Sequence, residues 1–173
     1  MKKGTVEIKK GTILLKSPEV SHTPFDRSVY LICEHSTNAT IGLRLDTPFV
    51  DQLPMGVEEL DPITVRRSGG QTQKKEIFLL HTDTTAKGVE ISHELFLGGE
   101  PDINKEIALV VGYTLWGAGK LIDEFLQGEW YIGYMHKKYL FQTPPEQLWQ
   151  KAVKDLGGRF TYVSHFPKEL HSN

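Results

Sequence analysis

The chain has 173 residues, of which 39% are hydrophobic and 24% charged, with a formal net charge of −2. This composition excludes an intrinsically disordered chain, and the length suits one domain that folds without disulfides or metals. We expect one compact domain over residues 1–173. Residues 1–11 are expected to form a flexible or peripheral N-terminal segment, and residues 165–173 a frayed C-terminus.

The N-terminus begins with lysines, as a signal peptide does, but Glu7, Lys9 and Lys10 interrupt any apolar stretch. The longest apolar runs, such as residues 107–111, are far shorter than the roughly 20 residues that span a bilayer. A lone cysteine, Cys33, suits a reducing compartment. The sequence therefore predicts a cytoplasmic protein with no membrane segment.

The first half of the chain has the features of β-structure. Residues 12–16 form a short β-like run, and residues 29–33 and 41–45 flank a polar loop, which predicts a hairpin. Residues 63–67 and 77–81 resemble a second strand pair around a Gly-rich turn at residues 68–72.

In the second half, strands are predicted at residues 89–91, 107–111 and 130–134. Ser92 is expected to cap a short helix that reaches Leu97. A second helix is expected over residues 120–127, before Gly128, and a third has Thr143 as N-cap, Pro144 at N1 and its end at Gly157. The predicted class is α+β, with a mixed, largely antiparallel sheet and helices packed around it.

An ordered set of segments between about residues 12 and 163 resembles the YqgE/AlgH family of bacterial proteins. The four segments are Leu14-Leu15-Lys16-Ser17-Pro18 with Pro24-Phe25-Asp26-Arg27-Ser28-Val29 and Cys33-Glu34-His35; Gly69-Gly70-Gln71 with Leu79-Leu80-His81-Thr82; Val111-Gly112-Tyr113-Thr114-Leu115-Trp116-Gly117-Ala118-Gly119-Lys120-Leu121; and Leu140-Phe141-Gln142-Thr143-Pro144. The third segment is followed by Glu129-Trp130, and the fourth by Leu148-Trp149 and Leu156-Gly157.

The resemblance implies a compact fold on a mixed β-sheet with surrounding helices and no established enzymatic activity. It also implies a transcriptional-regulator label, which one branch of the family carries. The sequence itself offers no helix-turn-helix, since residues 130–141 separate the two clear helices. Scattered pairs of basic residues and the net charge disfavour direct nucleic-acid binding, although Arg66-Arg67 and Lys74-Lys75 are candidates for a local basic patch.

Histidine and cysteine offer two catalytic hypotheses. Cys33 and His35 lie two apart on a predicted strand, but that spacing is loose for a nucleophile pair, so a small buried hydrophobe is the simpler interpretation of Cys33. His35 and His81 each end an apolar strand. If those strands are neighbours, the imidazoles converge with Arg27 or Glu34 in an acid-base or metal site; hydrogen bonding to loop backbone is the alternative.

The glycines offer a third hypothesis, anion binding, because residues 112–120 run from a strand into a helix. The segment matches neither the P-loop nor the dinucleotide fingerprint. The alternative is structural: the glycines allow a sharp turn and the aromatic residues fill the core beneath it. The candidate binding residues here and in the Gly-rich turn are Gly69, Gly70, Gly112, Tyr113, Trp116, Gly117 and Gly119.

The leading functional hypothesis is a non-enzymatic binding or regulatory module of the YqgE/AlgH type, with a protein partner or a small ligand. No cofactor and no metal are predicted. One alternative is a small-molecule enzyme or ligand-binding protein centred on His35, His81 and Arg27. The other is a transcription-associated regulator without a recognised DNA-binding motif.

Overall fold

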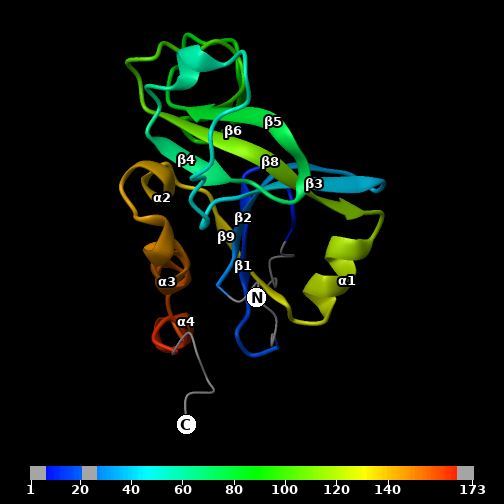
Figure 1. Ribbon diagram of the computed structural model, residues 1–173. Helices are drawn as coiled ribbons and strands as arrows, with labels where there is room; N and C mark the ends of the chain where they lie inside the picture. Colours follow the sequence, from blue (N-terminus) through cyan, green and yellow to red (C-terminus); the bar gives the residue numbers. More distant parts are fainter. Residues whose placement is uncertain (1–6, 21–26, 167–173) are drawn as a thin grey trace.

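The computed structural model describes residues 7–20 and 27–166, and nine strands in this part of the chain form one sheet (Figure 1). The strand order is β6-β7-β5-β8-β3-β2-β1-β9, and β4 also pairs with β8. The pairing of β4 with β8 is parallel and the other strand pairings between these elements are antiparallel. The predicted α+β class and mixed, largely antiparallel sheet are confirmed. The strands are β1 Thr12–Lys16, β2 Val29–His35, β3 Ala39–Arg44, β4 Val65–Ser68, β5 Thr72–His81, β6 Val89–Ser92, β7 Leu95–Leu97, β8 Ile107–Gly117 and β9 Trp130–Tyr134.

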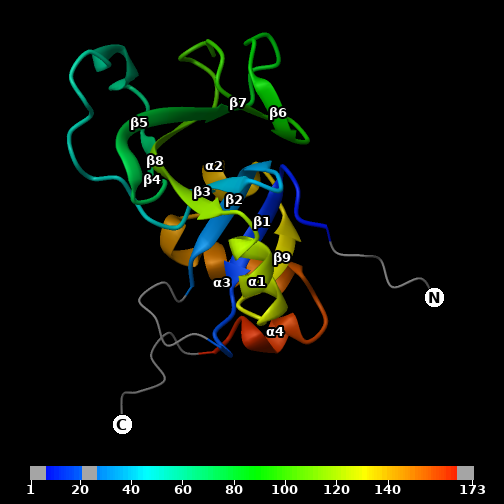
Figure 2. The same ribbon diagram turned by 90° about the vertical axis from the view of Figure 1, so that its right-hand side faces the viewer.

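The helices lie on both sides of the β9-β1-β2-β3 part of the sheet (Figure 1). Helix α1 (Lys120–Leu126) lies on one side, and α2 (Lys138–Phe141), α3 (Pro145–Asp155) and α4 (Phe160–Val163) lie on the other. A 3₁₀ turn, η1 (Glu58–Leu60), lies in the long connection between β3 and β4. Strands β4 to β8 curl above this body (Figure 2).

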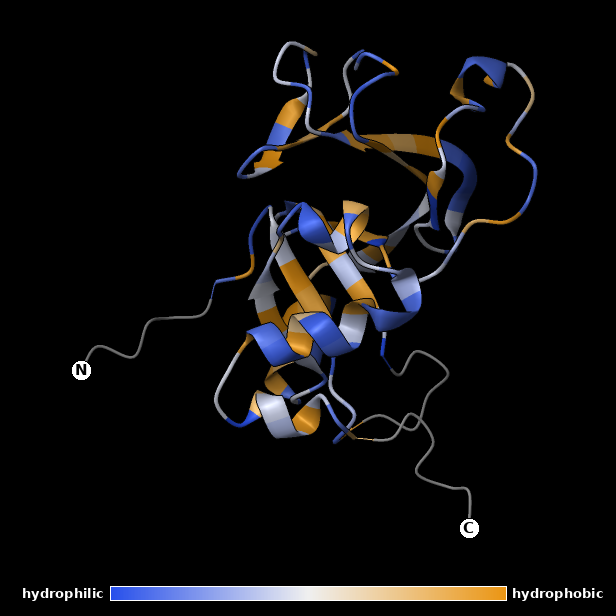
Figure 3. Ribbon diagram, turned by 90° about the vertical axis from the view of Figure 1, so that its left-hand side faces the viewer, coloured by the Kyte–Doolittle hydropathy of each residue, from blue (hydrophilic) through white to orange (hydrophobic). Residues whose placement is uncertain are grey.

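Strand β1 shows why two helical layers are needed, because its residues are buried on both faces. Ile13 and Leu15 belong to the main core with α3, whereas Leu14 belongs to a second cluster with residues from α1 and two tryptophans. Successive strand residues point to opposite faces, so a strand that is apolar throughout requires cover on both. Hydrophobic residues accordingly concentrate on the strands in Figure 3.

The predicted helix from Ser92 to Leu97 is wrong. Residues 95–97 form β7, which pairs with β6 and with β5, where Leu97 lies opposite Leu80. Glu94 has a φ of 59°, which belongs to a tight turn rather than a helix. Cross-strand packing of a buried Leu95 therefore overrides the weak cap signal of Ser92.

The third predicted helix is confirmed, but its start is shifted by one residue. Helix α3 begins at Pro145 with Pro144 as N-cap, and the Thr143 hydroxyl instead donates to the carbonyl of Lys138. Helix α1 has the predicted bounds within a residue, and Gly128 follows it with a φ of 80°.

The chain between β4 and β5 crosses β8, which is why these strands do not form the predicted pair. Both strands pair with residues 108–111 of β8, so they lie on its opposite edges. The connection passes over β8 where Gly69 and Gly70 meet Gly112 and Tyr113. A β-carbon on Gly69 would overlap the carbonyl oxygen of Gly112, so two backbones approach as closely as glycine allows.

Residues at the chain ends are only partly described. Of the segment predicted to be peripheral, Ile8 is buried and Gly11 donates its N–H to the carbonyl of Ile32, so the last residues of that segment pack on the sheet. Residues 1–6, 21–26 and 167–173 lie outside the described residues, and the family-like residues 24–26 are among them. Among the described residues no helix is both long and apolar enough to cross a membrane.

Cys33 lies at a bulge of β2 and packs against the main core, so we expect it to be chemically inert in the folded protein. Burial raises the pKa of the Cys33 thiol to about 12. Because the thiolate is the reactive form, iodoacetamide at pH 7.5 should label the native protein roughly 100-fold or more slowly than the urea-unfolded chain. The rate should still rise above pH 9. Equal rates for native and unfolded protein would contradict this assignment.

Candidate functional site

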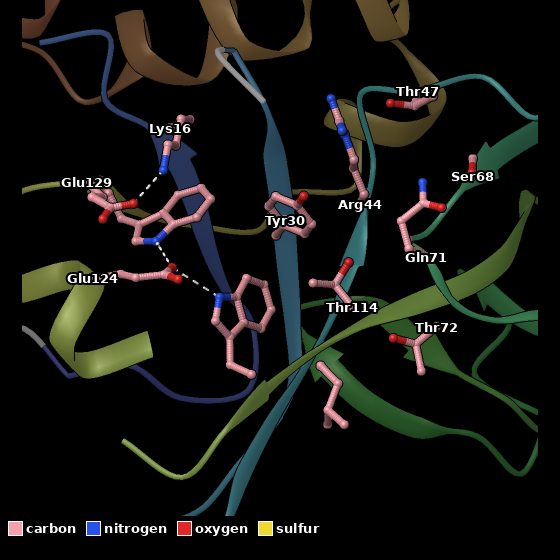
Figure 4. A pocket seen from close by; sticks show the side chains of 14 residues that line it. Lys16, Tyr30, Arg44, Thr47, Ser68, Gln71, Thr72, Thr114, Glu124 and Glu129 are labelled. Atoms are coloured by element: carbon pink, nitrogen blue, oxygen red, sulfur yellow. Dashed lines mark hydrogen bonds and ion pairs between the residues drawn. The ribbon is translucent and has the colours of Figure 1, made fainter. Parts of the chain in front are cut away.

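A cavity of about 460 Å³ lies between α1 and the crossing of the chain over β8 (Figure 4). We call it the aromatic cleft. Its volume is in the range of small-molecule sites. The residues that line it come from seven strands, α1 and three loops, and they are Lys16, Tyr30, Arg44, Thr47, Ser68, Gly70, Gln71, Thr72, Thr114, Leu115, Trp116, Glu124, Glu129 and Trp130.

One wall of the cleft is a triad of aromatic side chains, Tyr30, Trp116 and Trp130. Their ring centroids are 5.3, 5.6 and 6.3 Å apart and their planes are nearly perpendicular. At these distances the rings touch edge to face and leave no space for a ligand between them. Gly42 on β3 makes room for this packing, since a β-carbon there would come within 2.8 Å of the Trp116 ring.

Glu124 on α1 fixes the orientation of both indoles. One of its oxygens, Oε2, accepts hydrogen bonds from the Trp116 and Trp130 ring N–H groups at 3.1 and 2.8 Å. The other oxygen, Oε1, lies 3.8 Å from the Lys120 ammonium one turn earlier. The carboxylate is therefore held by structural contacts, and it ties the helix to two strands.

The two cations of the cleft are also engaged. Lys16 forms a 2.7 Å ion pair with Glu129, and its ammonium lies 4.5 Å from the centroid of the Trp130 ring. The Arg44 guanidinium donates two hydrogen bonds, of 3.0 and 2.9 Å, to the Asp46 carboxylate. Although burial disfavours its charge, the hydrogen bonds and charge of Asp46 raise the pKa of Arg44 above its ordinary value.

The opposite wall carries uncharged hydrogen-bonding groups (Figure 4). They come from β8 and from the segments on either side of the β8 crossing, and they are Thr47, Ser68, Gln71, Thr72 and Thr114. Two hydrogen bonds hold the crossing in place. The carbonyl of Gly69 accepts one from the backbone N–H of Arg44 at 2.8 Å and one from the Thr114 hydroxyl at 3.3 Å. The fold thus places an aromatic wall opposite a neutral polar wall.

Comparison with known proteins identifies the family. The family model described as AlgH-like matches residues 13–161. The chain belongs to the AlgH-like family. Among its relatives are UPF0301 proteins of Chlamydia felis, 35% identical over 96% of both chains, and of Chlorobaculum tepidum, 32% identical over 93% of this chain and 94% of the other.

Two solved structures share the fold. A crystal structure of a Corynebacterium diphtheriae protein has a TM-score of 0.76 and 20% identity, and covers 93% of this chain and 94% of its own. The solution structure of AlgH from Pseudomonas aeruginosa has a TM-score of 0.70 and 22% identity, and covers 98% and 100%. At these identities the likeness concerns the fold alone.

His35, His81 and Arg27, the centre of one functional hypothesis, do not converge in this AlgH-like protein. Strands β2 and β5 are separated by β8 and β3. His81 lies opposite Ile107 of β8. His35 lies opposite Thr40 of β3, which in turn lies opposite Trp116 of β8. Ile107 and Trp116 are nine residues apart on β8, or roughly 30 Å of extended chain. A shared site of these histidines is therefore wrong.

Each of the three residues has its own surroundings. His81 is fully buried: its Nε2–H donates to the carbonyl of Gly98 at 2.7 Å, and its Nδ1 accepts the Asp83 N–H at 3.2 Å. His35 Nδ1 lies 2.6 Å from the Thr40 hydroxyl, whereas the Cys33 thiol lies 3.8 Å from the Leu31 carbonyl. Arg27 stacks on Trp149, 3.9 Å from the ring centroid. No group of three potential metal ligands occurs among the described residues.

The candidate glycines and aromatic residues divide between structure and cleft. Gly112 lies inside β8, so residues 112–117 continue the strand instead of turning, and Gly69 and Gly112 serve the crossing. Gly70 and Trp116 line the aromatic cleft. Tyr113 packs on Phe78, whereas Gly117 and Gly119 border a separate shallow cavity beside His35.

The basic pairs do not combine into one patch. Arg67 is buried, with 6% of its surface exposed, and the Arg66 guanidinium donates to the carbonyls of Ile63 and Asp61. The sequence reasoning also missed the residues that build most of the cleft. Tyr30, Arg44 and Trp130 look like ordinary strand residues, and the one available signal was Trp130 within the family-like segments.

Proposed function

We propose that this protein is a ligand-binding module whose aromatic cleft takes a small, uncharged, planar heterocycle. The observation that supports the proposal is the pairing of an apolar aromatic wall with a wall of neutral hydrogen-bonding groups. A flat ring presents an apolar face and a polar edge, which match these two walls. A nucleobase or nucleoside is the simplest example of such a ligand.

The charges of the cleft favour an uncharged ligand. Lys16 is paired with Glu129, Arg44 with Asp46, and Glu124 with two indole N–H groups. A charged ligand would have to break one of these pairs. Removing one partner of a buried ion pair costs about 3–5 kcal/mol of free energy, because the other charge stays buried without compensation. Neutral donors and acceptors such as the Gln71 amide make no such demand.

Binding rather than catalysis follows from what the cleft supplies. The described residues that line it include no histidine or cysteine, and its two carboxylates are held by structural partners. A general base needs a carboxylate or imidazole within reach of the substrate and able to take a proton. We therefore propose a binding or regulatory module of the cytoplasm, with the small ligand as its partner rather than nucleic acid.

Gln71 offers the sharpest test, because it is exposed and its side chain makes no hydrogen bond to another described residue. Titration with nucleobases and nucleosides should shift the indole N–H resonances of Trp116 and Trp130, and Trp149→Phe assigns the third indole. Gln71→Ala should weaken binding roughly fivefold, by about 1 kcal/mol.

The matched control is Gln52→Ala, which removes an exposed glutamine outside the cleft and should leave the affinity unchanged. Two results would overturn the proposal. One is that no heterocycle moves the two cleft indoles. The other is that Gln71→Ala and Gln52→Ala bind the same compound equally well.

A further inference from the structure

Strand β9 ends the sheet beside β1, and it pairs with no other strand in the described part of the chain (Figure 2). Just before the strand, the carbonyl of Glu129 accepts the Ser17 N–H at 2.9 Å. Just after it, Met135 donates its N–H to the Gly11 carbonyl at 2.9 Å. In an antiparallel pair, residues that bond to the neighbouring strand alternate with residues that face away from it. The residues whose N–H and C=O groups face away from β1 are therefore Trp130, Ile132 and Tyr134.

The other edges of the sheet are protected against the addition of a strand. Strand β6, at the opposite end, has only four residues, an irregular register with β7 and an exposed acid, Glu90. The outer edge of β4 is covered by the chain after β3, where Pro48 forms an antiparallel bridge with Arg67. Short strands, charged side chains, bulges and covering loops are the usual means by which proteins block edge pairing.

Strand β9 has none of these protections. Its sequence, Trp-Tyr-Ile-Gly-Tyr, contains no charged residue and no proline, and it pairs with β1 in an unbroken register. Aromatic and β-branched residues favour strand pairing. Tyr134 at the end of the strand has 70% of its surface exposed. A regular, uncharged edge of this kind is a template for another strand.

The strand is complementary to a second copy of itself. When two copies run antiparallel with Ile132 opposite the partner's Ile132, each outward N–H meets a C=O of the other copy. Trp130 then lies opposite the partner's Tyr134, so the exposed tyrosine gains an aromatic neighbour. Tyr131 lies opposite the partner's Gly133, where no side chain competes for the space of its ring. No charges meet within the paired strands.

We propose that two copies of this chain associate by antiparallel pairing of their β9 strands about a two-fold axis at Ile132. The contact is the same on both copies, so one interface occupies both β9 edges and leaves neither free. It goes beyond the proposed function and does not depend on a ligand. It does place the partner's Tyr134 beside Trp130, a member of the aromatic wall of the cleft.

Sedimentation equilibrium of the full-length protein, from micromolar to millimolar concentrations, tests the association. Wild type should approach about twice the chain mass of 19.6 kDa as the concentration rises. Tyr134→Lys puts a charge on the edge at an exposed position. It should weaken the dimer roughly tenfold or more, because the symmetry removes two aromatic pairs at once.

Tyr162→Lys is the matched control for this variant. Tyr162 on α4 is 77% exposed, and it lies two residues along the helix from Phe160, which packs on Tyr131. Side chains two apart on a helix point to different sides, so Tyr162 faces away from β9. The control should therefore dimerise as wild type does, and circular dichroism should show the same fold in both lysine variants.

A cysteine at the proposed two-fold axis tests the register. Opposite residues of a hydrogen-bonded antiparallel pair have Cα atoms about 5.5 Å apart, a distance that a disulfide spans. Oxidation should therefore cross-link Ile132→Cys into a covalent dimer. Wild type should not cross-link, because its one cysteine, Cys33, packs against the main core.

Three results would overturn the proposal. A wild-type chain that stays monomeric at every concentration would leave the β9 edge to an extended segment of another protein. A Tyr134→Lys variant that dimerises as tightly as Tyr162→Lys would place the interface elsewhere on the surface. An Ile132→Cys variant that fails to cross-link would exclude the two-fold axis at this residue.

Discussion

Alanine at Gly70 is expected to lower the free energy of unfolding by about 3 kcal/mol or more, enough to leave much of the protein unfolded at 37 °C. A β-carbon at this position would overlap the Tyr113 carbonyl and the Thr114 hydroxyl, and φ at Gly70 is +153°, which L-residues rarely adopt. The atoms in the way include the backbone of a central strand, so no side-chain rearrangement relieves the clash. Urea denaturation followed by circular dichroism measures the loss.

Gly117→Ala is the control for this prediction. Gly117 lies at the end of β8, the strand that Gly70 approaches. A β-carbon added at Gly117 would meet no atom within 4 Å, and φ at Gly117 is not in the positive range that favours glycine. Its replacement should change the free energy of unfolding by less than about 0.5 kcal/mol. If Gly70→Ala proved as stable as Gly117→Ala, the crossing of the β4–β5 connection over β8 would be wrongly described.

Most strands and the later helices could be predicted from local patterns. Apolar runs such as residues 12–16 and 130–134, and glycines such as Gly128 and Gly157 after helical stripes, report local structure directly. The paired strands β2 and β3 follow from a short polar loop for the same reason. In each case, the interactions that decide the element lie within a few residues of one another.

The predicted pairing of β4 with β5 failed because the decisive contact is distant in sequence. Residues 69–71 look like a hairpin turn, and nothing in them reveals that β8, much later in the chain, inserts between the two strands. Gly112 carries the complementary signal, since it meets Gly70 at the crossing. The glycines of these two segments therefore reflect one close contact between two stretches of backbone, and not a catalytic motif.

The aromatic cleft was largely hidden for a similar reason. Its aromatic wall combines β2, β8 and β9, and each ring alone looks like a core residue. Trp116 and Gly70 were among the predicted candidates because they lie in Gly-rich, family-like segments. The grip of Arg44 on Asp46 and the buried charge of Arg67 depend on where β3 and β4 meet α3, which local sequence does not report.

Removal of the Glu124 carboxylate is expected to damage both the fold and the cleft. In Glu124→Ala the indole N–H groups of Trp116 and Trp130 lose their common acceptor, at a cost of about 2–4 kcal/mol in the free energy of unfolding. The loss of the two hydrogen bonds should also shift both indole N–H resonances upfield and weaken heterocycle binding, because the aromatic wall is no longer held in place.

Glu124→Gln separates the hydrogen bonds from the charge. Its amide oxygen can accept from both indoles, so the stability loss should fall to about 1 kcal/mol or less, and the two resonances should stay close to their wild-type positions. Asp123→Asn, an exposed acid on the same helix, should cost only a few tenths of a kcal/mol, as an acidic residue in the first turn does. If Glu124→Ala and Asp123→Asn were equally stable, Glu124 would not be what orients the tryptophans, and the aromatic wall would depend on ring packing alone.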